Sequence, residues 1–313
     1  MIVTERYNIS MSAEWDAAVA ASRNGTFLHM RGYMDYHSDR FTDFSLVART
    51  EKGHIAAILP AECKGSILRS HGGLTYGGWL MSDKADMNTM LEVWKSARDF
   101  ATGNGFDTLI YKPVPHIFHR YPAEEDLYAL FRDKASIQSV QISSVIDLDR
   151  PLPFDQNARR GVAKARKRSL TVRESDDFAT FWKILCAVLA ERHATAPVHT
   201  VSETGLLASR FPDNIRLFGV FEGEKMIAGT VLYISQTTAH AQYIASDTRG
   251  RETGALAMLF DTLVKQFSGS VRYFDFGTSN EDGGLVLNAG LVRQKCGFGA
   301  RAVAFNTYKV SWQ

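Results

Sequence analysis

Long apolar runs are missing from this chain of 313 residues. The longest run, from Ile184 to Ala190, has seven residues, whereas a membrane-spanning helix needs about 20. The first residues also lack an apolar core followed by a small-residue cleavage site. The sequence therefore predicts neither a transmembrane segment nor a secretory signal.

Cysteine and net charge are also scarce. Cys63, Cys186 and Cys296 lie far apart and are odd in number, so they predict neither a disulfide framework nor a metal site. This usage fits a reducing, cytoplasmic location. A net charge of +2 excludes a strong overall attraction to nucleic acid or membrane, so any such preference must be local.

Several sequence motifs of enzymes are absent as well. The chain has no HExxH pair, no G-x-S-x-G nucleophile elbow and no Walker-type phosphate loop. These absences disfavour a metalloprotease, an α/β-hydrolase and a P-loop NTPase.

What is present is typical of a globular protein of two domains. Hydrophobic residues make up 45% of the chain, and helical and strand-like periodicities follow the same order in both halves. We predict an α/β protein with mixed sheets, with domains at 1–150 and 151–313 joined by a proline-containing linker at 149–153. The predicted helices span 12–21, 87–101, 155–169, 176–195 and 253–267, with shorter ones after Pro122 and Thr200, and the predicted strands span 44–49, 54–59, 66–69, 76–80, 108–111, 140–146, 217–221, 226–233, 239–245, 273–276 and 302–310.

The segment 271–299 is the most informative part of the chain. A strand at 273–276 stops at Gly277 and a polar turn, a helical segment follows, and Lys295 lies just before a second glycine-flanked turn. A buried strand that ends in a polar loop and feeds a helix is where α/β folds place ligands. With the lysine, it predicts a site for an anionic or carbonyl-bearing group.

A second candidate site follows the strand at 239–245. The loop contains Arg249, Gly250, Arg251 and Gly254 and leads into an apolar helix. Glycines let the backbone approach a phosphate, and a helix N-terminus supplies N–H groups and positive potential. The pattern suits the pyrophosphate of a coenzyme, and it is equally typical of an ordinary strand–helix turn.

The most basic stretch is residues 157–169. Arg160, Lys164 and Arg168 recur every four residues and so share one helix face. This stripe suits a phosphorylated acceptor, a tRNA backbone or an anionic bilayer surface, and it is equally typical of a solvated helix face.

Three histidines are candidates for proton transfer or binding. His193 and His199 flank Pro197 at the end of a helix, and imidazole takes a proton from an ammonium near neutral pH. His71 precedes a stretch with four glycines in seven residues, 72–78, which allows close approach of a ligand. Each is equally compatible with a role in a cap or in the core.

Several of these stretches together resemble a known family. They are Phe27–His29, Ser70–Gly78, Asn157–Arg160, Asp275–Gly277 and Lys295–Gly299. On these residues the chain resembles, over most of its length, the tandem-GNAT acyltransferases of the Fem type (FemAB-like). The resemblance implies two GNAT-like domains with a shared cleft, and transfer of an acyl or aminoacyl group to an amine.

The resemblance also assigns residues. It gives Arg159, Arg160 and Lys164 to a phosphorylated acceptor, Lys295 to the donor ester, and the loop 249–254 to the donor. That loop usually ends in Gly or Ala, and this chain has Leu256 there, so aminoacyl-tRNA stays open as a donor beside acyl-CoA. The predicted site comprises catalytic His193, His199, Asp247 and Lys295; cofactor-binding Arg249, Gly250, Arg251 and Gly254; and substrate-binding His71, Tyr76, Arg159, Arg160, Lys164, Tyr243, Asp275, Ser279 and Asn280.

We predict an acyltransferase that moves an acyl group, acetyl first among the candidates, from acyl-CoA to an amine of a cell-envelope or polysaccharide precursor such as a nucleotide-linked amino sugar. A base among His193, His199 and Asp247 takes the proton, backbone N–H groups after Ala245 hold the oxyanion, and Lys295 stabilises charge at the donor. We expect Lys295 and the loop 249–254 to converge on one crevice between the two domains, without a metal.

Two alternatives stay open. One is an aminoacyl-tRNA-dependent peptidyltransferase that adds an amino acid to a peptidoglycan-type precursor, with tRNA as a partner. The other is a non-catalytic module that binds an anionic membrane surface or a carbohydrate.

Overall fold

The computed structural model describes residues 1–193 and 196–312 and divides the chain into two compact units. Unit 1 comprises residues 1–141, 283–285 and 304–313, and unit 2 comprises residues 142–282 and 286–303. The boundary predicted between residues 150 and 151 differs from the division in the structure. The reason is that β9 (Ser136–Asp147) and β17 (Arg301–Ser311) each contribute residues to both units.

Unit 1 is built from two small sheets and the helices around them. One sheet has the order β1-β3-β4-β7, and in the other β6 lies parallel to β8 and antiparallel to β5. The C-terminal end of β17 pairs antiparallel with β8. The elements of unit 1 are β1 (Ile2–Arg6), α1 (Ser12–Ala21), α2 (Arg31–Met34), β2 (Thr42–Asp43), β3 (Leu46–Thr50), β4 (Ile55–Leu59), β5 (Glu62–Lys64), β6 (Ile67–Arg69), β7 (Leu80–Met81), α3 (Met87–Gly103), β8 (Thr108–Tyr111) and α4 (Glu125–Arg132).

Unit 2 is built on one twisted sheet with the order β10-β11-β12-β13-β14-β9. Its neighbouring strands are antiparallel except β13 and β14, which run parallel. The elements are α5 (Gln156–Lys167), β10 (Thr171–Ser175), α6 (Phe178–His193), α7 (Val201–Arg210), β11 (Ile215–Glu222), β12 (Lys225–Ile234), β13 (Thr238–Ser246), α8 (Thr248–Thr253), α9 (Ala255–Phe267), β14 (Tyr273–Thr278), β15 (Asn280–Glu281), β16 (Val286–Leu287) and α10 (Ala289–Gly297).

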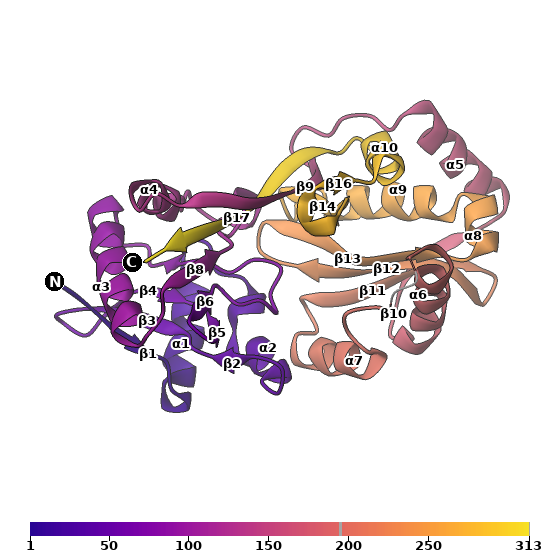
Figure 1. The fold of residues 1–313 in the computed structure, drawn as a ribbon. Helices are drawn as coiled ribbons and strands as arrows, with labels where there is room; N and C mark the ends of the chain where they lie inside the picture. The colour runs from indigo at the N-terminus through magenta and orange to yellow at the C-terminus, as the bar shows by residue number, and fades with distance from the viewer. Residues whose placement is uncertain (194–195, 313) are drawn as a thin grey trace. The chain divides into compact units, whose positions relative to one another are not determined.

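Helices cover both faces of the sheet in unit 2. Figure 1 shows α5 and α9 above the sheet and α6 and α7 below it. Helix α9 buries Phe260, Leu263 and Phe267, which recur at helical spacing and face the sheet. Helix α5 packs on α9 through Ala158, Val162 and Ala165, and small side chains there let the two helices approach closely.

The predicted mixed α/β class is confirmed, and most predicted elements lie within two or three residues of the observed ones. The predicted strand 76–80 is wrong in extent, because only Leu80–Met81 pairs with a neighbour. The helix predicted from Thr253 begins instead at Ala255, after α8 and a left-handed Gly254. None of the helices in the described residues is long and apolar enough to cross a bilayer.

Candidate functional site

The site of unit 2 is organised by an opening between the parallel strands β13 and β14. They pair only at Thr238–Tyr273, Ala239–Phe274 and His240–Asp275 among the described residues. On the other side of β13, Gln242 is an extra residue in the ladder with β12. Beyond His240 the backbone groups of β13 that face β14 therefore have no strand partner and are available to a ligand.

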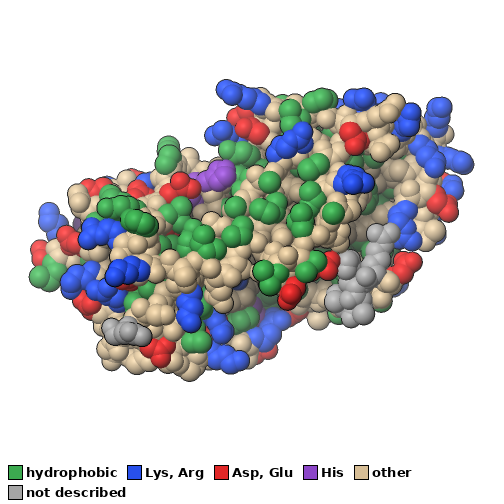
Figure 2. Space-filling model, turned by 45° about the horizontal axis from the view of Figure 1, so that its top comes forward, with side chains coloured by type: hydrophobic (Ala, Val, Ile, Leu, Met, Phe, Trp, Pro, Cys, Tyr) green, Lys and Arg blue, Asp and Glu red, His purple; other side chains and the backbone are tan. Residues whose placement is uncertain are grey.

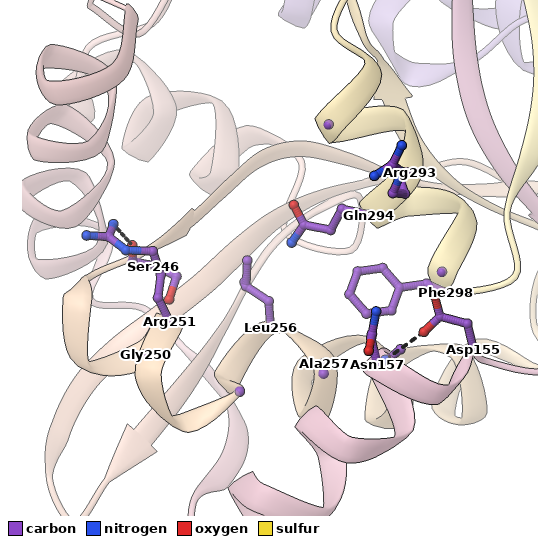
Figure 3. Close-up of a pocket in the computed structure, with 14 residues that line it drawn as sticks. Asp155, Asn157, Ser246, Gly250, Arg251, Leu256, Ala257, Arg293, Gln294 and Phe298 are labelled. Carbon is purple, nitrogen blue, oxygen red and sulfur yellow. Dashed lines mark hydrogen bonds between the residues drawn. The ribbon is translucent and has the colours of Figure 1, made fainter.

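Two adjoining cavities lie along this opening. The first, which we call the polar pocket, has a volume of about 420 Å³ and contains Arg251, Arg293, Gln294 and Asn157 in its lining (Figure 3). The second, which we call the apolar pocket, has a volume of about 410 Å³. Both are lined by residues of unit 2, and they share Ser246, Arg251, Leu256, Gln294 and Phe298.

The N-terminus of α9 lies at the polar pocket. Gly254 precedes it with a φ of +79°, and no side chain caps the helix. The first N–H groups of a helix lack an intrahelical acceptor and carry positive potential, which suits an anion. A Cβ on Gly254 would meet the backbone oxygen of Gly161 at 2.5 Å, and one on Gly250 would meet that of Ile227 at 2.6 Å. Both glycines are therefore required by close backbone packing.

The two arginines of the predicted donor loop have different environments. The guanidinium of Arg251 donates to the Ser246 carbonyl at 3.1 Å and lines both pockets. The guanidinium of Arg249 instead donates twice to the Glu222 carboxylate, at 2.8 and 2.5 Å. The geometry therefore places Arg251 at the cavity and holds Arg249 in an ion pair.

Asp247, a predicted base, is the N-cap of α8. Its carboxylate accepts a hydrogen bond from the backbone N–H of Gly250 at 2.7 Å. This is the usual role of Asp at a helix start. Its role as a base stays a prediction.

Lys295 lines the apolar pocket and is only 4% exposed. Its Nζ donates to the carbonyl oxygens of Gly277 and Thr278 at 2.8 and 2.9 Å and to Ser279 Oγ at 2.9 Å. Burial lowers the pKa of the lysine to about 8, although the nearby Asp275 opposes this shift. Lys295 thus fixes the turn after β14. Lys295 and Arg251 both line this pocket, whose described lining belongs to unit 2, whereas the sequence predicted a crevice between the two domains.

A buried carboxylate and an imidazole occupy the last rung of the parallel ladder. Asp275 Oδ2 lies 2.7 Å from His240 Nδ1, and Asp275 Oδ1 accepts from Ser143 Oγ and from the Gly277 N–H at 2.9 Å. Burial tends to raise the pKa of Asp275, but His240 and these hydrogen bonds outweigh it and leave that pKa below its usual value. Because the ionised carboxylate only accepts, Nδ1 is the ring nitrogen that donates to Asp275.

A second histidine lies on the same side of the sheet as α6. His199 Nδ1 is 2.6 Å from the hydroxyl of Tyr243, whose ring packs edge-on against Trp182. Burial raises the pKa of Tyr243. The pair therefore links the loop before α7 to β13.

The other residues of the predicted site are distributed over both units. His193 ends α6, and its side chain lies outside the described part of the structure. Asn280 Oδ1 accepts from the Ile142 N–H at 2.6 Å. In unit 1, His71 and Tyr76 are 3% and 4% exposed, and burial lowers the pKa of His71 to about 3.

The basic residues of α5 are exposed. Arg159, Arg160 and Lys164, and Arg168 directly after the helix, all face solvent, whereas Asn157 and Ala158 at the start of the helix line the polar pocket. Figure 2 shows Lys and Arg side chains gathered over the end of unit 2 that carries α5. The positive surface therefore continues from the pocket along this helix.

Sequence reasoning missed His240, Ser143 and Arg293. His240 is a polar residue within an apolar strand, which was the available signal, but its partner depends on the register of a parallel pair. Among the described residues, no group of His, Cys, Asp and Glu is arranged to hold a metal ion.

Comparisons with known proteins agree with this architecture. Residues 154–282 match the family model for the Acetyltransferase (GNAT) domain. No curated protein matches the chain.

Solved structures match over nearly the whole chain. FemX has 14% identity and a TM-score of 0.69, with 98% of this chain and 97% of that one covered. A tandem GNAT protein from the clavulanic acid biosynthesis pathway has 12% identity and a TM-score of 0.54, with coverages of 99% and 98%. The C-terminal domain of a putative lysylphosphatidylglycerol synthetase from Agrobacterium fabrum has 10% identity and a TM-score of 0.60, with coverages of 96% and 92%. At these identities the likeness is one of fold.

Proposed function

Because this chain carries a GNAT acyltransferase domain at residues 154–282 and has the tandem-GNAT fold of FemAB-like proteins, we propose that it transfers an acyl group from acyl-CoA to a primary amine. The observation that carries the proposal is the pair of adjoining pockets at the opening of β13 and β14, beside the uncapped N-terminus of α9. The coenzyme's diphosphate would lie at this N-terminus with Arg251 and Arg293, and its thioester would reach the opening.

In the proposed reaction the amine nitrogen attacks the thioester carbonyl and forms the new C–N bond. The proposed base is His240, which directly precedes the pocket residues Ala241 and Gln242 in β13; it takes a proton from the amine nitrogen, and Asp275 holds the ring and stabilises the imidazolium. The C–S bond then breaks, and the sulfur leaves as the thiol of coenzyme A after accepting the proton. Backbone N–H groups of β13 beyond His240 stabilise the oxyanion. We thus add His240 to the candidate bases His193, His199 and Asp247, which stay predictions.

The acceptor we propose is an amine on a phosphorylated precursor of the cell envelope. FemX and the lysylphosphatidylglycerol synthetase share the fold, and the exposed cations of α5 continue from the polar pocket. A cationic face of this kind attracts phosphate groups. These observations support the class of acceptor and leave the individual compound open.

Transfer of an aminoacyl group from tRNA is the second candidate function, since the solved structures with a similar fold include FemX and a lysylphosphatidylglycerol synthetase. The apolar pocket favours an acyl group without charge. None of its described lining residues is Asp or Glu, and Arg251 and Lys295 are both there. The α-ammonium of an aminoacyl ester would meet cations without a counter-ion.

Binding of coenzyme A tests the proposal directly. We expect coenzyme A to raise the melting temperature, because a ligand at 100 times its Kd stabilises the folded state by about 2.7 kcal/mol. Arg251→Ala should weaken binding by about 10- to 100-fold, since a hydrogen bond to a charged group contributes about 1.5–3 kcal/mol. Arg249→Ala is the matched control, because Glu222 holds its guanidinium, and it should bind normally. Stabilisation by charged tRNA and not by coenzyme A would reject the proposal.

A further inference from the structure

The two pockets of unit 2 differ in chemistry although they share part of their lining. The polar pocket contains two arginines together with Asn157 and Asp155. Eleven of the sixteen described residues that line the apolar pocket are aliphatic or aromatic, and the other five, Gln242, Ser246, Arg251, Gln294 and Lys295, are polar. A ligand that occupies both would be anionic at one end and apolar at the other.

The apolar pocket extends through the opening between the strands. Its lining includes Leu185, Val188 and Leu189 from α6 and Leu256 and Phe260 from α9. These helices cover opposite faces of the sheet (Figure 1). The cavity therefore continues past the end of the paired ladder, where the reacting carbonyl would lie, toward α6.

We infer that this α6 end of the apolar pocket holds the aliphatic chain of the donor, so that the acyl group is a medium-chain fatty acyl group. The inference rests on the proposed function, because it places the thioester at the opening of β13 and β14. An acetyl group has a single methyl group beyond its carbonyl and would leave most of the apolar lining unfilled. Unfilled apolar surface forfeits packing contacts, whereas a hydrocarbon chain restores them.

The pocket limits the length of the chain, because a cavity of about 410 Å³ must also hold the end of the pantetheine arm. A medium chain, with octanoyl as the length to test, is therefore what we propose.

A series of acyl-CoA ligands tests the inference. The affinity of the purified chain is measured by calorimetry for coenzyme A and for its acetyl, butyryl, hexanoyl, octanoyl and palmitoyl thioesters, all below their micelle concentrations. Each added methylene should tighten Kd by about fourfold, which corresponds to about 0.8 kcal/mol, until the pocket is full near octanoyl. Equal affinity for acetyl-CoA and octanoyl-CoA would overturn the inference and leave the proposed function standing. No binding of coenzyme A or of any thioester would reject the proposed function itself.

A pair of variants on α6 locates the chain. Val188 is half-buried and lines the pocket, whereas the adjacent Ala187 is exposed and does not line it. Val188→Trp should remove the preference for octanoyl-CoA and preserve the affinity for acetyl-CoA. Ala187→Trp adds the same bulk on the solvent side and should leave the whole series unchanged. An unchanged series in Val188→Trp would place the chain elsewhere and overturn the inference.

Discussion

Asp275→Asn tests the proposed base at a single atom. In the native structure Asp275 Oδ2 accepts the Nδ1 proton of His240, while Oδ1 accepts from Ser143 and from the Gly277 N–H. In the variant, the amide oxygen keeps the bonds of Oδ1, and the NH₂ group faces His240. An NH₂ group only donates, so the ring proton must move from Nδ1 to Nε2. The nitrogen that takes the proton from the amine is then blocked.

The expected loss follows from the role of a base. General-base catalysis contributes about 100- to 10,000-fold, or about 3–5 kcal/mol of activation free energy. We expect the rate of thiol release with an amine panel to fall by that factor, while the Kd for coenzyme A stays unchanged because Asp275 does not line either pocket. Stability should fall by only about 1–2 kcal/mol, since the hydrogen bonds stay but lose their charge.

Two measurements, the tautomer of His240 and the rate of thiol release, test this prediction. Nitrogen NMR of the imidazole should show His240 protonated at Nδ1 in the native protein and at Nε2 in the variant. Ser143→Ala is the control, because it removes only the hydroxyl on Oδ1 and should leave the tautomer and the rate within a few-fold. If folded Asp275→Asn keeps the native tautomer, or loses less than about threefold in rate, the reasoning about His240 is refuted.

Two further predictions concern stability. Burial lowers the pKa of Lys295 from 10.5 to about 8, so the unfolded state binds the lysine proton more tightly than the folded state does. As the pH rises from 8 to 10.5, the free energy of unfolding of the native protein, measured in urea, should therefore increase by about 3 kcal/mol relative to that of Lys295→Met. Parallel pH curves for the two proteins would contradict this. Gly254→Ala should lower stability by about 2 kcal/mol or more because of its positive φ and its contact with Gly161, whereas Gly103→Ala, which meets nothing within 4 Å, should be neutral or slightly stabilising in thermal unfolding.

The fold could be predicted where local pattern determines it. Helix α3, strand β8 and the hairpin β11–β12 follow from apolar spacing and turn residues, which act over a few residues. The boundary between the two units was predicted less accurately than the helices and strands. Strands β9 and β17 each run without a break across the boundary, so the sequence pattern does not reveal where one unit ends and the other begins.

The candidate site could also be predicted only in part from the sequence. Lys295 and the loop 249–254 were predicted to converge in a crevice between the two domains, and Lys295 and Arg251 both line the apolar pocket of unit 2. The separation of Arg249 from this cavity depends on Glu222, 27 residues earlier. The pairing of His240 with Asp275 spans 35 residues and depends on the parallel register. Contacts of this kind arise from tertiary structure, which local spacing does not encode.

The central claim is that the pockets of unit 2 bind the donor at the start of α9 and along the open edge of β13. Backbone amide chemical shifts of the whole chain, followed during titration with octanoyl-CoA, test it most directly. We expect the largest changes at Arg251, Ala255, Leu256 and Gln242. Changes confined to unit 1, or to the exposed face of α5, would contradict it.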